Sequence, residues 1–472
     1  MSLPSPIPAT QAEPPSNGGP KPKLWQAGTL VYTQSGLAVL FAWLLWGDFA
    51  WSIRDRVVVT VLQLVLKSYE VSDFVAGLLI GTLPAILGVL VGPVVCFKSD
   101  RHRGPRGRRI PYLLTSAPVA ALSIIGFGFS PLFGKLLHEA LGTFSPGLNA
   151  SVVMVLAFWW MIFDVANTIL NSIFGALICD VVPTPVIGRF YGFFRAVSLI
   201  VGIAFTTWVL GRAEEYFVWL FIAVGVIYGV GVVSMCLKVK EGEYPPPLHA
   251  VARRGLPGVL ESIKLFFKQS FSIPYYVWYF IASNLGPLTF APIYIYIVFY
   301  AKSLGMSMSM SAYGGYMSVS FAISFVLTFF LGSLADRFHP LRMLIVTLVL
   351  YVATVLWAYF FVSAASFGVI TVLLNVLSGA YYTGAASLNQ RLLPSSIFAE
   401  LSSASGLINA LLYAVAPLIF GAILDYSGHC YQLIFLMALV IAALSVASFV
   451  VVYRYWKKYG GFFHYVAPMI EG

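Results

Sequence analysis

Apolar residues dominate this chain in twelve long stretches, and the segments between them carry most of the charge. About 20 helical residues cross a hydrocarbon core of roughly 30 Å. The stretches are long enough to do so, and the pattern therefore predicts an all-α membrane protein with twelve spanning helices. We place them at 37–66, 74–96, 111–133, 150–179, 187–211, 217–237, 273–300, 309–334, 341–362, 366–391, 401–424 and 432–453.

One long polar interruption, 238–272, divides the spans six and six. It contains three consecutive prolines and then an amphipathic stretch, which predicts a cytoplasmic linker followed by a helix lying on the membrane face. The halves are therefore expected at 37–237 and 273–453. Residues 1–36 are expected to form a disordered tail and lead-in, and 454–472 a C-terminal tail.

Composition supports a membrane protein, since 59% of the residues are hydrophobic and only 10% are charged, against about 25% charged in soluble domains. The net charge of +10 reflects 28 Lys and Arg residues. Most of them fall in the loops on one side, which predicts that both termini are cytoplasmic, in a plasma or inner membrane. The positive charge is thus a topology signal and does not indicate nucleic acid binding.

No catalytic or metal-binding pattern stands out in the sequence. The four cysteines and six histidines are scattered without metal-type spacing. The chain has no phosphate-binding loop of an ATPase and no nucleophile–base motif. We expect neither enzyme activity nor a cofactor or metal.

The stretch 37–66 is unusual because four charges interrupt it, at Asp48, Arg54, Asp55 and Arg56. Asp48 falls near the bilayer centre, where a charge costs at least about 2.5–3.5 kcal/mol. Asp48, Ser52 and Asp55 are spaced to share one helix face. We interpret this face as the lining of a transport pathway. The alternative is that the four charges neutralise one another or reach the membrane surface at a helix end.

The fourth span carries a second polar face, formed by Asp164, Asn167 and Asn171. Hydrogen bonding between helices is the alternative role for the two asparagines. Arg195, in the fifth span, is a candidate partner for Asp164 or Asp48, or part of a gate.

The second half holds few charges within its spans and instead offers amides and aromatic rings. Rings stack on apolar sugar faces while polar groups bind hydroxyls, and Asn284, Trp51, Tyr279 and Tyr382 are therefore candidate ligands. Packing or a position at the membrane interface is the alternative for most aromatic residues. In this division the N-terminal half holds the charged machinery, and Asp48 or Asp55 couples an ion to the solute.

The loop after the second span contains Asp100-Arg101 and then Gly107-Arg108-Arg109, and the loop after the eighth span contains Asp336-Arg337 and Arg342. These motifs resemble the signature of the major facilitator superfamily. Cys96 replaces the expected glycine, and the first loop is longer than usual. The longer form, with Gly47-Asp48-Phe49, resembles the glycoside–pentoside–hexuronide and sucrose–proton symporters.

The resemblance implies two six-helix bundles that rock around a central site. Asp100 would accept hydrogen bonds from arginine and latch the cytoplasmic side. Asp180 and Arg189 are assigned to the same gate. The alternative is that these charges only anchor the topology.

The sequence therefore predicts a secondary transporter, monomeric in the lipid bilayer, that moves a small solute by alternating access. Cation-coupled symport of a sugar or glycoside is the favoured function, with H⁺ or Na⁺ as the coupling ion. The alternatives are another solute, such as an organic anion or drug and possibly by antiport, or a transporter-like sensor that moves nothing.

Overall fold

A computed structural model describes residues 24–243, 271–303, 305–394 and 398–468. In this part of the chain twelve helical segments are long and apolar enough to cross a membrane. They are Gln34–Ser68, Asp73–Arg101, Ile110–Gly128, Leu148–Val181, Thr184–Arg212, Phe217–Lys238, Pro274–Ala301, Met310–Thr328, Pro340–Phe361, Phe367–Leu392, Leu401–Tyr426 and Leu433–Lys458. The predicted all-α membrane fold with twelve spans is confirmed.

The N-terminal half begins with a short β-hairpin and continues with helices. Its elements are β1 (Trp25–Ala27), β2 (Leu30–Tyr32), α1 (Gln34–Ser68), α2 (Asp73–Gly77), η1 (Leu78–Thr82), α3 (Leu83–Arg101), α4 (Ile110–Gly128), α5 (Ser130–Leu141), η2 (Gly142–Phe144), α6 (Leu148–Val181), α7 (Thr184–Ala204), η3 (Phe205–Val209), η4 (Leu210–Arg212) and α8 (Phe217–Lys238). The segments η1 and η3 are π-helical, so the second and fifth spans each contain a π-bulge.

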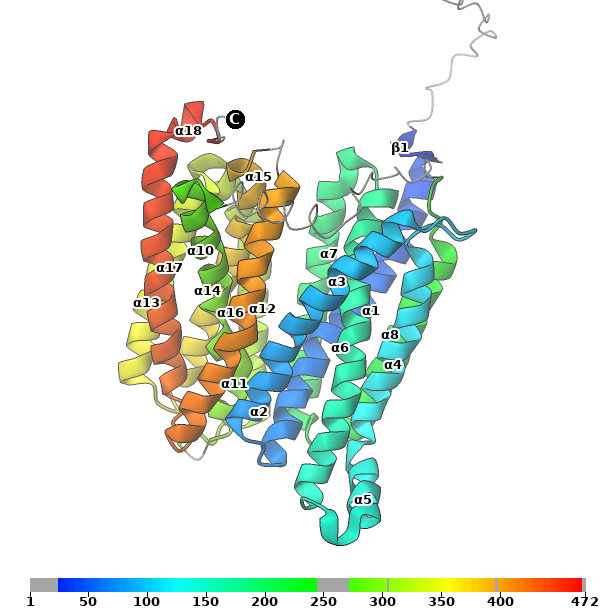
Figure 1. Ribbon diagram of the computed structural model, residues 1–472, viewed down its shortest axis with the longest axis vertical. Coiled ribbons are helices and arrows are strands. Elements are labelled where there is room, and N and C mark those ends of the chain that lie inside the picture. The colour runs from blue at the N-terminus through cyan, green and yellow to red at the C-terminus, as the bar shows by residue number, and fades with distance from the viewer. Residues whose placement is uncertain (1–23, 244–270, 304, 395–397, 469–472) are drawn as a thin grey trace, which may run out of the picture.

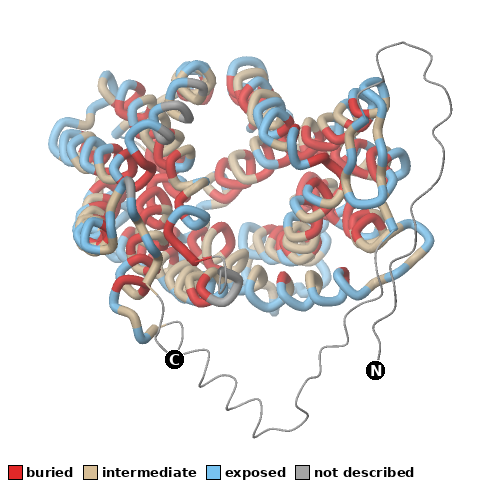
Figure 2. The backbone as a smooth tube through the Cα atoms, turned by 90° about the horizontal axis from the view of Figure 1, so that it is seen from above, coloured by how far each residue is buried: buried red, intermediate tan, exposed pale blue. Residues whose placement is uncertain are grey.

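The C-terminal half consists of α10 (Pro274–Leu288), α11 (Ala291–Ala301), α12 (Met310–Phe338), α13 (Pro340–Phe361), α14 (Phe367–Ala385), α15 (Leu388–Leu392), α16 (Phe398–Tyr426), α17 (Leu433–Lys458) and α18 (Gly461–His464). Figure 1 shows the two halves as bundles standing side by side. Seen from above, buried positions gather inside each bundle (Figure 2). Within them, α4 packs against α6 and α8, and α17 packs against α10 and α13.

Two features depart from the sequence prediction. The lead-in to the first span is not disordered throughout, because β1 and β2 pair antiparallel with Trp25 opposite Tyr32. The third span ends at Gly128 rather than 133, and the separate helix α5 follows it. The predicted disorder of residues 1–23 and most of the predicted linker helix, at 244–270, lie outside the described residues.

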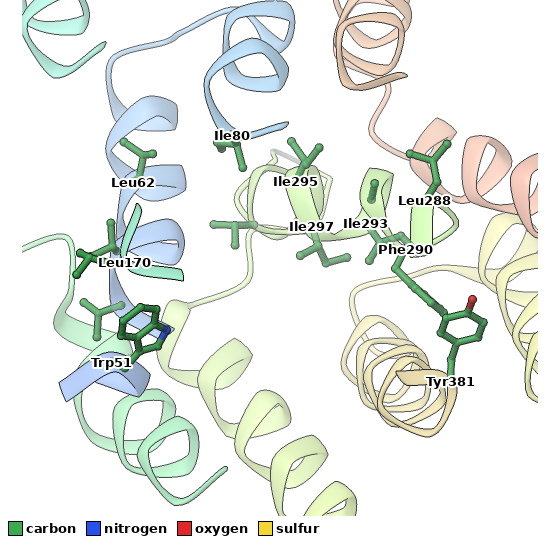
Figure 3. Packing of buried hydrophobic residues seen from close by; sticks show 14 of the residues in the cluster. Trp51, Leu62, Ile80, Leu170, Leu288, Phe290, Ile293, Ile295, Ile297 and Tyr381 are labelled. Carbon is green, nitrogen blue, oxygen red and sulfur yellow. The ribbon is translucent and has the colours of Figure 1, made fainter. Parts of the chain in front are cut away.

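The two halves pack together at the end of the molecule that holds α2 and α11, opposite the end that holds β1 and α18 (Figure 1). There α2 and η1 contact α16, η3 contacts α12, and α1 contacts α11. Figure 3 shows Ile80 of η1 and Ile295 of α11 in the core between the halves. Because β1 and α18 lie at one end, the two termini of the described chain share a side; which side is cytoplasmic stays a prediction.

Candidate functional site

Two carboxylates are buried in the N-terminal bundle at mid-span. Asp48 of α1 has no exposed surface, and Asp164 of α6 is 3% exposed. Both oxygens of Asp48 and Oδ2 of Asp164 are buried without a hydrogen-bond partner among the described residues, although Ser52 lies near Asp48 one helical turn along. Such groups carry a large desolvation cost unless something neutralises or coordinates them. This pair therefore has capacity to hold a proton or a small cation.

Arg54 lies within electrostatic range of Asp164. Its Nη1 lies 2.7 Å from Oδ1 of Asp55. Its guanidinium carbon lies 4.6 Å from the ring centroid of Trp51 and 5.4 Å from that of Tyr228. Its Nε and Nη2 have no partner among the described residues. Arg54 is thus only partly neutralised and can respond to the charge state of the buried acids.

Tyr294 of α11 is the residue of the C-terminal half that lies opposite the charged groups of α1. It is 57% exposed, although the other ten residues of α11 are buried. Tyr294 lies within electrostatic range of Asp55 and Arg56 of α1, and we infer that its exposed ring faces a cavity between the halves. Asp55, with 54% of its side chain exposed, and Tyr382, 49% exposed, both lie within electrostatic range of Tyr294. The predicted Asp55 and Tyr382 thus belong to one cavity, together with Tyr294.

Arg56 and Arg195 lie beside this cavity, close enough to repel each other. Arg56 donates from Nη2 to Oγ of Ser198 at 3.1 Å, and its guanidinium carbon is 4.6 Å from the ring centroid of Phe321. Because Ser198 is on α7 and Phe321 on α12, Arg56 spans both halves. Arg195 is half-buried and has no ion pair among the described residues, so its predicted pairing with Asp48 or Asp164 is not observed.

Three predicted ligands are buried and make contacts with neighbouring side chains or backbone groups. Trp51 is 8% exposed and stacks on Phe174, with ring centroids 4.9 Å apart. Tyr279 is fully buried and donates to the amide oxygen of Asn389. Asn284 donates to the carbonyl of Phe280 at 2.7 Å and to Oγ of Ser405 at 3.0 Å. Their side chains are used in packing and hydrogen bonds in this structure, and their assignment as ligands stays a prediction.

The other predicted polar residues of α1 and α6 differ in how far they are buried. Ser52 is buried at 3% exposure. Asn167 is half-buried, and its Oδ1 has no partner among the described residues. Asn171, one turn further along α6, is exposed. Burial along this face of α6 therefore decreases from Asp164 through Asn167 to Asn171.

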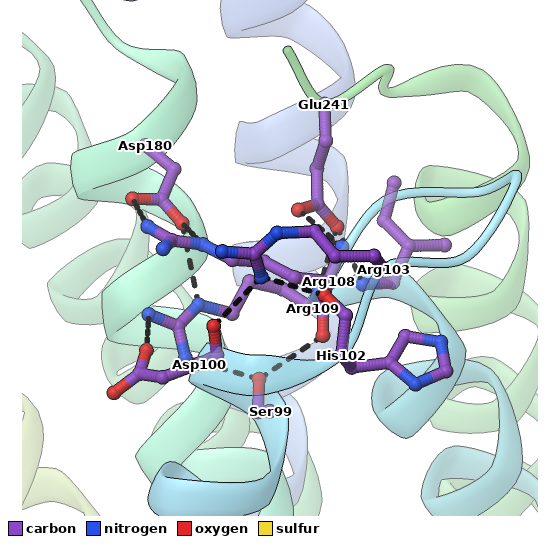
Figure 4. A network of polar contacts seen from close by, with 9 residues as sticks. Ser99, Asp100, His102, Arg103, Arg108, Arg109, Asp180 and Glu241 are labelled. Atoms are coloured by element: carbon purple, nitrogen blue, oxygen red, sulfur yellow. Dashed lines mark hydrogen bonds and ion pairs between the residues drawn. The ribbon is translucent and has the colours of Figure 1, made fainter. Parts of the chain in front are cut away.

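The predicted gate motif forms a dense polar network (Figure 4). Arg108 binds Asp180 through both Nε, at 3.1 Å, and Nη2, at 2.6 Å. Arg109 reaches Asp100 at 2.5 Å, Asp180 at 3.2 Å and Oγ of Ser99 at 3.0 Å. These bonds join the ends of α3, α4 and α6 within the N-terminal half. The predicted Asp100–arginine contact is confirmed, but it does not bridge the halves in this structure.

Glu241, which follows α8, completes this network and was not predicted. Its carboxylate accepts the backbone N–H groups of Arg108, Arg109 and Ile110 at 2.9, 2.8 and 2.7 Å. It therefore caps the N-terminus of α4 with a negative charge, the favourable sign at that end of a helix. The only hint in the sequence is an acidic pair directly after a basic helix end.

The remaining predicted gate residues lie apart from the network. Arg101 stacks on Phe97 of its own helix at 3.4 Å. Arg189 is exposed, whereas Asp180 pairs with Arg108 and Arg109, and the assignment of Arg189 to the gate stays a prediction. In the C-terminal half the side chain of Asp336 lies outside the described residues. Arg337 and Arg342 contact aromatic rings, those of Phe338 for Arg337 and of Tyr453 and Trp456 for Arg342.

Comparison with known proteins adds independent evidence. The family model of the Major Facilitator Superfamily matches residues 48–414. The sucrose transport protein SUT5 of Oryza sativa subsp. indica is 28% identical over 143 residues, which are 29% of this chain and 26% of that protein. The sucrose transport protein SUC4 of Arabidopsis thaliana is 31% identical over 122 residues, 25% of this chain and 23% of that protein. The matches thus span about a quarter of these relatives.

Solved structures resemble the whole fold. A bacterial homologue of the human lysosomal transporter Spinster, inward-facing and occupied, aligns with a TM-score of 0.62 at 15% identity, covering 89% of this chain and 97% of that one. The inward-open xylose transporter XylE from E. coli aligns with a TM-score of 0.62 at 12% identity, covering 92% and 97%. At these identities the likeness establishes the fold alone.

Proposed function

Because this chain belongs to the Major Facilitator Superfamily, we propose that it is a secondary active transporter that moves a sugar or glycoside together with a cation by alternating access. Asp48 and Asp164 would carry the coupling ion, while Asp55, Arg56, Arg195, Tyr294 and Tyr382 would face the solute. The cargo would enter the cavity between the two bundles. No bond is made or broken in the solute, and the chain is not expected to act as an enzyme.

The observation that carries this proposal is the burial of Asp48 and Asp164 with three carboxylate oxygens, both of Asp48 and Oδ2 of Asp164, that accept no hydrogen bond of normal geometry from a described residue. A structural carboxylate is normally paired or hydrogen-bonded when buried, as Asp180 is in the same half. A carboxylate left open at mid-span can instead exchange a cation with the cavity. H⁺ is our first choice and Na⁺ the alternative. Arg54, between Asp164 and Asp55, would transmit the change of charge to the cavity wall.

The choice of a sugar has two supports. The curated relatives named above are sucrose transport proteins, and the cavity pairs charged groups with the rings of Tyr294 and Tyr382. Carboxylate and guanidinium groups bind neighbouring hydroxyls, and a ring covers an apolar sugar face. Asp55 and Arg56 would provide the polar contacts from α1.

Uptake by proteoliposomes tests the proposal. Wild-type protein should accumulate a labelled sugar under an inward proton gradient, and a protonophore should abolish accumulation. Asp48→Asn should lose accumulation at least about tenfold, because an amide cannot carry the coupling proton, yet retain part of the sugar exchange. Glu139→Gln, an acid on the exposed helix α5, is the matched control. Undiminished accumulation by Asp48→Asn would remove Asp48 from the coupling role.

An organic anion is the second candidate solute, favoured by the adjacent Arg56 and Arg195. Two guanidinium groups side by side suit a carboxylate or phosphate group. Competition separates the candidates, because unlabelled sugar acids would then displace the labelled substrate better than neutral sugars. Stronger competition by neutral sugars would reject the anion.

A further inference from the structure

A second cluster of titratable groups lies at the closed end of the molecule, away from the cavity acids. Asp73, the first residue of α2, has a fully buried side chain. Its Oδ2 lies 2.7 Å from Nδ1 of His429, and its Oδ1 accepts a hydrogen bond from the hydroxyl of Tyr431 at 3.1 Å. His429 and Tyr431 belong to the turn between α16 and α17. An acid of one half is therefore held by the other half.

Asp425, in the last turn of α16, makes the reciprocal contact. Its Oδ1 accepts the backbone N–H of Asp73 at 2.8 Å, and its Oδ2 accepts that of Phe74 at 2.9 Å. A carboxylate of the C-terminal half thus caps a helix of the N-terminal half. All four carboxylate oxygens of Asp73 and Asp425 contact protein donors. The cluster therefore joins the two halves and leaves no carboxylate oxygen free for an ion.

The surrounding contacts depend on the same close approach. The hydroxyl of Tyr296 donates to the backbone carbonyl of Asp73 at 2.9 Å. Nζ of Lys67 donates to the hydroxyl of Tyr431 at 3.0 Å. These contacts exist only while α2 and α16 are packed together, and an opening of this end would break them all.

We propose that Asp73, Asp425 and His429 form a proton-sensitive latch that holds this end of the pathway closed, with His429 as the sensor. Histidine is the side chain that ordinarily changes charge between pH 5 and 8. His429 faces Asp73 at 2.7 Å and Asp425 at 3.8 Å. Among the described residues, other titratable groups of this cluster are Tyr431, stacked on the His429 ring, Lys67, which contacts Tyr431, and Tyr296, which contacts the backbone of Asp73.

The direction of the effect follows from the charges. With neutral His429, two carboxylates face each other across the seam and repel. Protonation of His429 places a cation between them and turns its bond to Asp73 into a charge-assisted one. Acid on this side should therefore favour the closed form, and alkali the open form. The latch rests on alternating access, but it depends neither on the solute nor on coupling through Asp48.

Pulsed electron paramagnetic resonance on the full chain in nanodiscs tests the latch. Spin labels would replace Phe144 and Phe361, exposed residues of opposite halves at this end, after serine replaces the four free cysteines, Cys96, Cys179, Cys236 and Cys430. Without solute or gradient, the ratio of short to long distances should fall about tenfold between about pH 6 and pH 8. A ratio that does not change with pH would overturn the proposal.

Variants locate the sensor. His429→Gln should abolish the pH response, while His138→Gln, a histidine on α5 at the same end, should retain it. Asp425→Asn should lower the closed fraction at about pH 6, where the Asp425 carboxylate faces protonated His429, with Glu139→Gln as its control. Asp48→Asn should keep the full response whether or not it transports. A response that survives in His429→Gln but disappears in Asp48→Asn would overturn the latch and place the sensor in the cavity.

Discussion

Carboxylates of the same type serve three different purposes here, and their partners distinguish them. Asp180 is satisfied by Arg108 and Arg109 and fixes helix ends. Asp425 caps a helix of the opposite half. Asp48 has open buried oxygens among the described residues, which is the state expected of a group that exchanges an ion. The contacts of each carboxylate are therefore our basis for expecting a functional role for Asp48 and a structural one for Asp180.

His339 gives a residue-scale prediction on pH. It caps α13, lies in the left-handed region at φ 73° and stacks on Trp456 with ring centroids 4.6 Å apart. Burial, and then the charges of Arg391 and Arg342, lower the pKa of His339 to about 4. Its neutral form is therefore the folded form, and protonation must work against folding.

The sign follows by linkage. The pKa of His339 is lower in the folded protein than the value of about 6.5 expected in the unfolded chain. The free energy of unfolding is therefore unaffected by His339 above about pH 6.5 and decreases as the pH falls toward about 4. His339→Asn keeps a residue that tolerates positive φ but does not titrate. Its melting temperature in detergent should fall a few degrees less between about pH 7 and pH 4 than that of wild type. His464→Asn, an exposed control, should behave as wild type; equal acid sensitivity in His339→Asn would contradict the assignment.

Residue types and spacing predicted part of the site. Asp48, Asp55, Arg56 and Asp164 were identifiable because a charge in an apolar span is costly and is usually kept for a function. Aromatic and amide residues gave no such signal, since Tyr279 packs inside its bundle while Tyr294, fifteen residues later, faces the cavity. The direction in which an aromatic ring points depends on the helices that pack around it. The sequence of one apolar stretch does not identify those helices.

At the scale of elements, glycines set how closely the two halves approach. A Cβ added at Gly421 of α16 would lie 2.4 Å from the carbonyl oxygen of Asp73 and 2.6 Å from Cα of Phe74. One added at Gly77 would lie 2.4 Å from the carbonyl oxygen of Pro417. These neighbours are backbone atoms, which cannot turn aside as a flexible side chain could. The α2–α16 seam therefore requires glycine.

Gly421→Ala should consequently force the seam apart. The closed fraction, measured with the labels at positions 144 and 361, should fall several-fold. Gly406→Ala is a matched control on the same helix, because nothing lies within 4 Å of its added Cβ. A closed fraction in Gly421→Ala equal to that of Gly406→Ala would show that the seam tolerates the methyl group.

The cap on α4 gives a second prediction for an element. Glu241→Gln removes the charge that three backbone N–H groups share, and it should lower stability by about 1–2 kcal/mol. Thermal unfolding in detergent would measure the change. Glu243→Gln, an exposed acid two residues later, should have little effect. Equal melting temperatures for the two variants would reject the cap.

Spans were predictable because apolar length is a strong local signal. The β-hairpin, the helix α5 and the π-bulges η1 and η3 were not predicted. Each lies at a span end or inside a span, where the choice among helix, turn and bulge depends on what packs against it. The latch of Asp73, Asp425 and His429 joins residues more than 350 positions apart. No local sequence pattern could have placed these residues together.

For the whole molecule, the two bundles divide the work of transport. The N-terminal bundle holds the buried acids and the network of Figure 4, and the C-terminal bundle contributes Tyr294 and Tyr382 to the cavity. Their interface is closed at the α2 end by the latch. Arg56 of α1 contacts both bundles, and we expect it to link occupancy of the proposed cavity to rearrangement of the halves.

The most direct test is charge movement upon substrate addition. Proteoliposomes on a solid-supported membrane, held without an ion gradient, would receive a jump in sugar concentration. Wild-type protein should give an inward current that persists during transport, because each sugar carries a cation with it. Asp48→Asn should give at most a brief binding transient. Sugar uptake without current in wild type, or a sustained current in Asp48→Asn, would contradict coupling through Asp48.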